Sequence, residues 1–178
     1  MKRKKSHMGA GILPYAYKPE LVFLLGQENK GNNPKRNELY CDFGGGAEKG
    51  ETPTQTAYRE FKEETMNAVG NNRSIKRALK NPTIKYIAKN KYHAYVIPIA
   101  YNRDLPHIYN RIMKELEKCM SYKKYKNYKH LTVKSCPVGL CEKMRLKWFT
   151  PSEIIQNKHK MRPIFYRTFI KIIKKLNK

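Results

Sequence analysis

Acidic residues are scarce in this sequence. Only 14 Asp and Glu residues stand against 38 Lys and Arg residues, so the 178-residue chain carries a formal net charge of +24. Such an excess excludes the acidic, solvating class of proteins and favours a polyanionic partner such as a nucleic acid or a polyphosphate. A bias of the whole genome towards Lys and Asn codons is the alternative explanation.

Cysteine is also rare, with four residues in the chain. This number excludes a disulfide-rich secreted scaffold, and we expect free thiols in a reducing compartment such as the cytoplasm. Cys136 and Cys141, with His130 nearby, suggest a zinc site as the alternative. Their loose spacing, without a second close pair, favours ordinary buried thiols.

Long apolar stretches are absent, which argues against a membrane-spanning helix and predicts no membrane partner. The basic segment Lys2–Lys5 precedes no apolar stretch, so it does not resemble a secretory signal. We interpret it as a basic arm, with a nuclear signal as the alternative.

The length fits a single domain over residues 1–178 with a core of its own. Alternating and continuous apolar patterns predict strands, and apolar residues three and four apart predict helices. The predicted strands cover residues 9–17, 21–26, 39–43, 83–88, 92–101, 131–133 and 144–149; the predicted helices begin at residue 53, near 150, and cover 105–120 and 163–176. Pro98 predicts that its strand has an edge position or a bulge.

Residues 44–66 carry the clearest chemical signal. A run of three glycines leads into a helix that begins near Pro53, a residue suited to the first helical turn. Glu60, Glu63 and Glu64 fall on one flank of that helix. Like charges at this spacing repel one another unless a cation lies against them, and divalent ions such as Mg²⁺ prefer carboxylate oxygens.

This stretch resembles the Nudix box. The matching residues are Gly45, Glu51, Arg59, Glu60, Phe61, Glu63 and Glu64. The pattern departs at its end, where Met66 replaces a glycine and Asn67 replaces an apolar residue. We expect Asn67 or Gly70 to supply the left-handed residue that ends the helix.

The resemblance implies a Nudix-type α/β/α sandwich with a mixed β-sheet, here with a basic helical insertion at about residues 102–130. It implies Mg²⁺ or Mn²⁺ as cofactor, held by the carboxylates and by the backbone carbonyl of Gly44. The Glu51–Arg59 pair, together with Gly45, would have a structural role. The metal ligands implied are Gly44, Glu60, Glu63 and Glu64, and the candidates for the catalytic base are Glu63 and Glu142.

Two further groups are candidates for contacts with the substrate. Tyr40, Phe43 and Gln27 are candidates to line a pocket for a base or another ring. A Tyr- and Lys-rich segment combines charge with aromatic rings and is predicted to contact nucleic acid, or alternatively to cover the core with its tyrosines. Its nucleic-acid-binding candidates are Lys123, Lys124, Tyr125, Lys126 and Lys129.

Three functions follow from these patterns. The first is hydrolysis of the 5′ cap of mRNA, which releases a nucleoside diphosphate and leaves 5′-monophosphate RNA. The Lys- and Asn-rich chain also resembles the decapping Nudix proteins of large DNA viruses. The second is hydrolysis of a compact polyanion, such as a diphosphoinositol polyphosphate or a dinucleoside polyphosphate. The third is RNA binding without catalysis, against which the intact carboxylates of the box argue.

Overall fold

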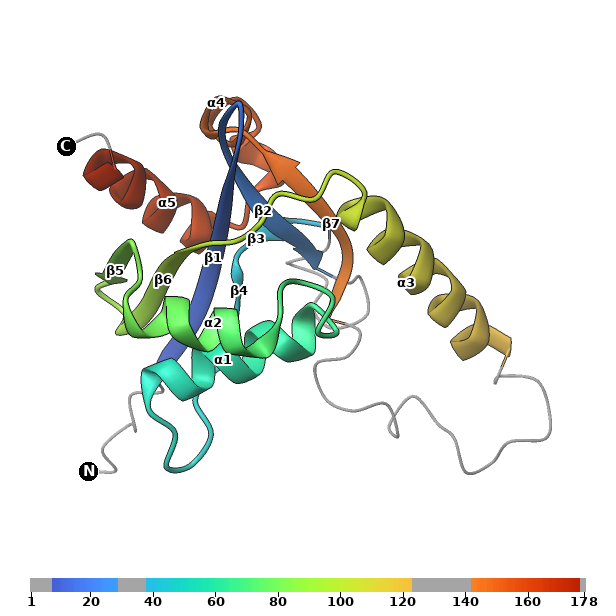
Figure 1. Cartoon of the computed structure of the whole chain (residues 1–178), viewed down its shortest axis with the longest axis horizontal. Helices are drawn as coiled ribbons and strands as arrows, with labels where there is room; N and C mark the ends of the chain where they lie inside the picture. The colour runs from blue at the N-terminus through green and yellow to red at the C-terminus, as the bar shows by residue number, and fades with distance from the viewer. Residues whose placement is uncertain (1–7, 29–37, 123–141, 177–178) are drawn as a thin grey trace.

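The computed structural model of the protein describes residues 8–28, 38–122 and 142–176. Four strands come first, followed by two helices, two strands, one helix, one strand and the C-terminal helices (Figure 1). The strands are β1 (Gly9–Lys18), β2 (Glu20–Glu28), β3 (Tyr40–Cys41), β4 (Phe43–Gly46), β5 (Ile84–Ile87), β6 (Tyr92–Pro98) and β7 (Lys143–Phe149). The helices are α1 (Pro53–Glu64), α2 (Asn72–Lys80), α3 (Leu105–Tyr122), α4 (Pro151–Gln156) and α5 (Pro163–Leu176), with a 3₁₀ turn at Lys158–Lys160.

The strands form one mixed sheet in the order β3-β2-β1-β6-β5, to which β4 is added beside β1 and β7 beside β2. β1 is its centre: it runs antiparallel to β2 and β4 and parallel to β6. The parallel pair requires a crossover, which α1 and α2 provide between β4 and β5. The expected mixed sheet is therefore confirmed.

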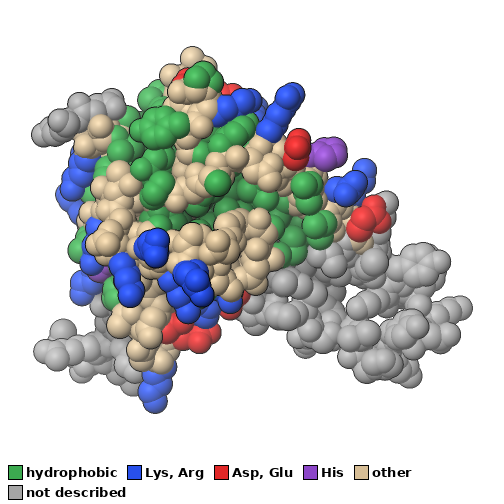
Figure 2. Space-filling model, in the orientation of Figure 1, with side chains coloured by type: hydrophobic (Ala, Val, Ile, Leu, Met, Phe, Trp, Pro, Cys, Tyr) green, Lys and Arg blue, Asp and Glu red, His purple; other side chains and the backbone are tan. Residues whose placement is uncertain are grey.

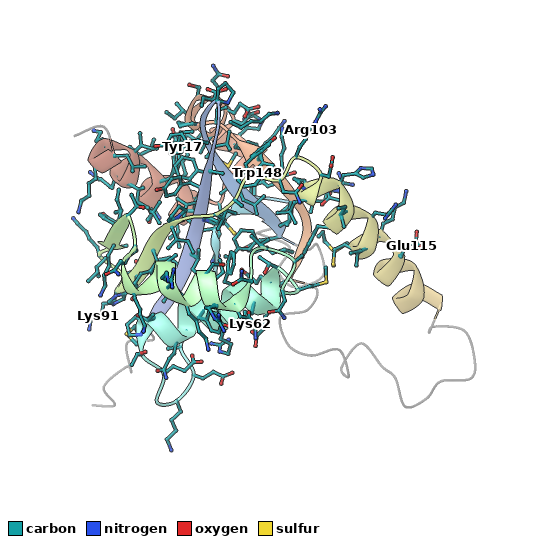
Figure 3. All side chains as sticks on the ribbon, in the orientation of Figure 1. Tyr17, Lys62, Lys91, Arg103, Glu115 and Trp148 are labelled. Atoms are coloured by element: carbon teal, nitrogen blue, oxygen red, sulfur yellow. The ribbon has the colours of Figure 1, made fainter. Side chains whose placement is uncertain are left out.

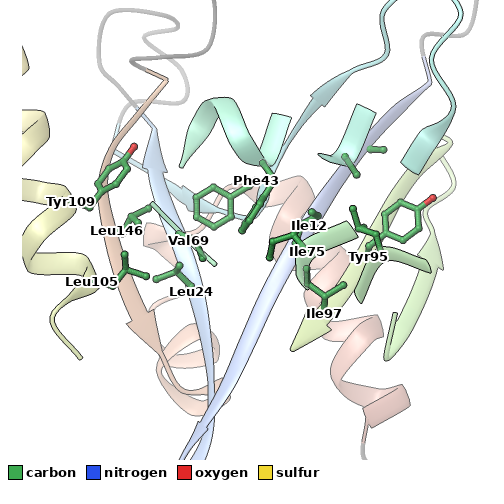
Figure 4. Packing of buried hydrophobic residues seen from close by; sticks show 14 of the residues in the cluster. Ile12, Leu24, Phe43, Val69, Ile75, Tyr95, Ile97, Leu105, Tyr109 and Leu146 are labelled. Carbon is green, nitrogen blue, oxygen red and sulfur yellow. The ribbon is translucent and has the colours of Figure 1, made fainter. Parts of the chain in front are cut away.

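Side chains alternate between two apolar layers, as the pleat of a strand requires. Ile12 faces the layer covered by α1, α2 and α3, whereas its neighbour Leu13 faces the layer covered by α4 and α5. Leu24 lies in the first layer and Phe23 in the second. Figure 4 shows the first layer closing around Phe43, with Tyr109 of α3 packed at its edge. The sheet is thus buried on both faces, as expected for an α/β/α sandwich.

Helix α1 begins where its sequence predicts. Thr52 is the N-cap, its side chain accepts from the backbone N–H of Gln55, and Gln55 accepts in return from the N–H of Thr52. This capping box and Pro53 fix the entry of the chain into the helix. Ala57 and Phe61 are buried against the sheet. Their burial fixes the rotation of α1 about its axis and therefore the position of its acidic flank.

The helix ends differently from the prediction. Met66 and Asn67 both adopt left-handed backbone conformations, with φ values of 51° and 56°, and Gly70 follows with a φ of 67°. Asn67 and Gly70 are left-handed as expected, but Met66 itself also takes the conformation that suits the glycine it replaces. A side chain in this region costs about 1–2 kcal/mol, which the packing of Met66 against the first apolar layer helps to offset.

Two other predictions need correction. Helix α2 is absent from the elements predicted from the sequence, although Asn71 is its N-cap and the apolar residues Ile75 and Leu79 lie one turn apart. Pro98 does not mark an edge strand, since β6 lies between β1 and β5. It is instead the last residue of β6, beyond the residues that pair with β5, so its missing N–H disturbs no hydrogen bond to that strand.

Several predictions fall outside the described residues. These are the strand at 131–133, the zinc alternative at His130, Cys136 and Cys141, and the basic segment with Lys123, Lys124, Tyr125, Lys126 and Lys129. The helix expected at 105–120 is confirmed as α3, which packs against β7. Among the described helices, none combines the length and apolar character that crossing a membrane requires.

Helix α2 presents a basic surface. Its exposed cations are Arg73, Lys76, Arg77 and Lys80, and it contains no acidic residue. Figure 2 shows Lys and Arg side chains gathered over this helix. Lys62 of α1, labelled in Figure 3, belongs to the same surface, because Lys62 and Lys76 lie 5.5 and 5.1 Å from the centre of the Tyr58 ring.

Candidate functional site

Three carboxylates from two distant parts of the chain meet beside β4. Glu60 and Glu64 are buried on successive turns of α1, and Glu142 lies directly before β7. One oxygen of each lies within 4.8 Å of the others. Such closeness of like charges is unfavourable without a cation, and three hard oxygen donors suit Mg²⁺ or Mn²⁺.

Strand β4, called the glycine strand here because it contains Gly44, Gly45 and Gly46, leaves space for these carboxylates. A Cβ atom on Gly45 would lie 2.5 Å from the carboxyl carbon of Glu60, so any larger residue there would displace this carboxyl group. The backbone N–H of Gly44 donates to Oε2 of Glu64 over 2.8 Å. The three-glycine run therefore acts through close approach of its backbone to the acidic flank of α1.

Arg59 ties the loop after β4 to the helix. Its Nε and Nη2 donate to the two oxygens of Glu51 over 2.7 and 3.0 Å, and Nη2 also donates to the carbonyl of Gly46 over 3.0 Å. The expected Glu51–Arg59 pair is thus present. Hydrogen bonding to Arg59 lowers the pKa of Glu51 to about 2. With these partners Arg59 has little freedom to contact a substrate.

Glu63 is not among the three carboxylates that meet within 4.8 Å of one another. Its Oε2 accepts from Nη1 of Arg59 over 3.2 Å, and the same nitrogen donates to Glu60 over 2.8 Å. The structure therefore brings Glu142, rather than Glu63, to Glu60 and Glu64. Roles for Glu63 as ligand or base, and for Gly44 as a carbonyl ligand, stay predictions.

A buried lysine stands behind the carboxylates. Lys143 is 2% exposed, and its Nζ lies 3.2 Å from Oε1 of Glu64, 3.8 Å from Oε1 of Glu28 and 3.0 Å from Sγ of Cys41. The antiparallel register of β2 and β7 places Lys143 opposite Glu28. Its stem lies over Gly26, where a Cβ atom would come within 2.8 Å of it.

Burial sets the electrostatics of the group. Desolvation raises the pKa of Glu60 and of Glu64, and Lys143 opposes this effect at Glu64. Desolvation also raises the pKa of the Cys41 thiol to about 12, so this cysteine is not a nucleophile. Burial and neighbouring carboxylates thus penalise the ionised form of these groups, and a divalent cation would offset that penalty.

Two of the three carboxylates, Glu64 and Glu142, border a cavity of about 310 Å³. Gly44, Gly45 and Gly46 line it together with Glu64 and Glu142, and Glu28, Asn90, Tyr92 and Arg162 also border it. Sequence reasoning missed Glu28, Lys143 and Arg162. The one available signal was Glu28, a charged residue at the end of the apolar strand β2. The sequence does not show that Lys143 and Arg162 are the partners of Glu28.

The predicted ring pocket is wrong as far as Phe43 is concerned. Phe43 is fully buried and packs edge-on against Phe61, with ring centres 5.4 Å apart. Tyr40 packs against Phe149, and Gln27 donates to the backbone carbonyl of Glu38. Neither borders the cavity beside the carboxylates.

The buried pair generates a stability prediction. We expect Lys143→Met to lower the free energy of unfolding by about 3 kcal/mol, because it removes the buried cation that contacts Glu64, Glu28 and Cys41. The double variant Lys143→Met/Glu64→Gln should recover at least about 1 kcal/mol of this loss. Urea unfolding measures both, with Lys147→Met on the exposed side of β7 as control. Additive losses in the double variant would contradict the coupling.

A second prediction concerns pH. Because the pKa of Glu51 is lowered to about 2 in the folded protein, its pairing stabilises the fold above an unfolded-state value near 4.5 and is lost as pH falls towards 2. Glu51→Gln should therefore cost about 2 kcal/mol at pH 7 and progressively less below pH 5. Urea unfolding across this range tests it. The exposed Glu20→Gln is the control, and a pH-independent cost of Glu51→Gln would refute the prediction.

Solved structures of other proteins share this fold. A bifunctional NMN adenylyltransferase/ADP ribose pyrophosphatase from Francisella tularensis, in complex with AMP and a Mn ion, is similar at a TM-score of 0.60 and 14% identity, over 98% of this chain and 43% of that one. The Nudix hydrolase RenU from M. smegmatis is similar at a TM-score of 0.50 and 15% identity, over 97% and 87%. At such identities these likenesses show the fold.

No curated protein matches the chain. The family described as NUDIX domain matches residues 5–171, which is nearly the whole sequence and includes the carboxylate helix and all seven strands. The chain therefore belongs to the NUDIX domain family.

Proposed function

We propose that this protein is a Mg²⁺- or Mn²⁺-dependent pyrophosphohydrolase that removes the 5′ cap of mRNA. The observation that carries the hydrolase assignment is the meeting of Glu60, Glu64 and Glu142 within 4.8 Å, beside a cavity that Glu64 and Glu142 border. The RNA assignment has separate support, from the charge of the chain and the basic surface of α2.

The chemistry divides among the residues of the site. A divalent cation supplies charge neutralisation on the phosphates and acidifies a bound water. Glu60 and Glu64 would hold it, with Glu63 and the Gly44 carbonyl as further candidate ligands. Glu142 would accept the proton of the attacking water, because it borders the cavity, whereas Glu63 is bound to Arg59.

The basic surface of α2 favours a long polyanion over a compact one. Four exposed cations without an acidic neighbour on this helix can each neutralise one phosphate. The predicted contacts of Lys123, Lys124, Tyr125, Lys126 and Lys129 would add to this surface. A compact polyanion, such as a dinucleoside polyphosphate, is the alternative substrate, and binding of RNA without catalysis is the alternative function.

The hydrolase assignment predicts that Glu60→Gln, Glu64→Gln and Glu142→Gln each lower kcat by at least about 100-fold, since each removes a ligand or the base. RNA affinity should stay within about twofold, because the α2 surface is untouched. Turnover of capped RNA and calorimetric Mn²⁺ titration measure these effects. Glu20→Gln is the matched exposed control. Full turnover by Glu64→Gln would contradict the proposal.

The RNA assignment predicts a steep salt dependence. Uncapped RNA should compete with capped RNA, and replacing Arg73, Lys76, Arg77 and Lys80 by Gln should reduce the salt slope of RNA affinity by about 3. Hydrolysis of a free cap dinucleotide should not change in this variant. If the wild-type protein cleaves the dinucleotide as efficiently as capped RNA, the compact-substrate alternative replaces this one.

A further inference from the structure

Arg162 is the cationic side chain of the cavity. Of the described residues that border it, three are carboxylates, Glu28, Glu64 and Glu142, and Arg162 alone carries a positive charge. A polyphosphate that enters this cavity needs cations on its path. The carboxylates provide for one through a metal ion, and Arg162 is a second that the fold itself supplies.

The fold holds Arg162 firmly. The preceding Met161 forms a bridge with Tyr40, and the backbone N–H of Arg162 donates to the Tyr40 carbonyl over 2.9 Å. Its Nη1 donates to Oε1 of Glu28 over 3.1 Å. The Arg162 side chain also hydrogen-bonds Cys41. A guanidinium carries five N–H donors in a fixed fork, more than these two contacts engage, and such a fork suits phosphate oxygens.

A chain of alternating charges separates Arg162 from the metal-binding carboxylates. Arg162 contacts Glu28 at 3.1 Å, Glu28 lies 3.8 Å from Lys143, and Lys143 lies 3.2 Å from Glu64. Lys143 is buried behind this row and is not among the residues that border the cavity, whereas Arg162 is. Arg162 therefore borders the same cavity as Glu64 and is separated from Glu64 by Glu28 and Lys143.

We propose that Arg162 binds a third phosphate, next to the two held by the metal, so that the preferred substrates carry at least three consecutive phosphates. This inference rests on the proposed hydrolase function. An adjoining cavity of about 80 Å³ shares Arg162, but it is bordered by none of Glu60, Glu64 and Glu142, which meet closely enough to hold a metal ion. The third phosphate is therefore assigned to the larger cavity, which Arg162 borders together with Glu64, Glu142 and the glycines of β4.

The test compares pyrophosphate with tripolyphosphate in calorimetric titrations of the full chain with Mn²⁺ present. We expect Arg162→Gln to weaken tripolyphosphate binding by about tenfold or more and to change pyrophosphate and Mn²⁺ binding by less than about twofold. Arg162→Lys should recover part of the loss, because it keeps the charge without the fork. Arg167→Gln, an exposed charge change on α5, is the matched control.

Thermal unfolding of each variant separates a binding effect from loss of the fold. Equal weakening of both anions by Arg162→Gln, or no weakening of tripolyphosphate, overturns the third-phosphate assignment and leaves the hydrolase function standing. If the wild-type protein binds neither anion with Mn²⁺ and cleaves no phosphoanhydride, the proposed function has failed and the assignment fails with it.

Discussion

The structure depends on the crowding of carboxylates at one end of α1. Glu60 and Glu64 are buried where solvation is poor, and Glu142 approaches them from another part of the chain. Burial and mutual repulsion both favour neutral carboxyl groups. The fold accepts this cost because Arg59, Lys143 and a backbone amide stabilise part of the charge. The remaining charge is what a divalent cation would bind.

The glycine strand and the buried lysine serve this arrangement from opposite sides. Gly45 leaves space for the Glu60 carboxyl group, and Gly26 leaves space for the Lys143 stem, so backbone and side chains approach more closely than larger residues permit. Lys143 in turn contacts both Glu64 of α1 and Glu28 at the end of β2. The acidic group, the cavity and Arg162 are thereby parts of one connected charge network rather than separate surface features.

The substrate assignments rest on different parts of the molecule. Hydrolysis of a phosphoanhydride follows from the carboxylates and from membership of the NUDIX domain family. Recognition of RNA would involve the cations of α2, whereas the length of the phosphate chain would be sensed by Arg162. A capped RNA and a dinucleoside polyphosphate both carry a chain of phosphates, but only the capped RNA has a long strand for the cations of α2 to contact. The α2 surface and Arg162 would therefore determine separate aspects of substrate specificity.

The sequence by itself determined the local elements. These are the carboxylate helix with its cap, the Glu51–Arg59 pair and the strands whose side chains alternate between two apolar layers. These features depend on spacings of a few residues, which helical and strand periodicity translate directly into geometry. Helix α2 also depends on local features, its N-cap Asn71 and its apolar pair, although it was not among the predicted elements. Only the tertiary structure decided that Glu28, Glu64, Lys143 and Arg162 meet, because their contacts arise from strand register and from the return of the chain before α5. No local pattern encodes contacts between residues so far apart in the chain.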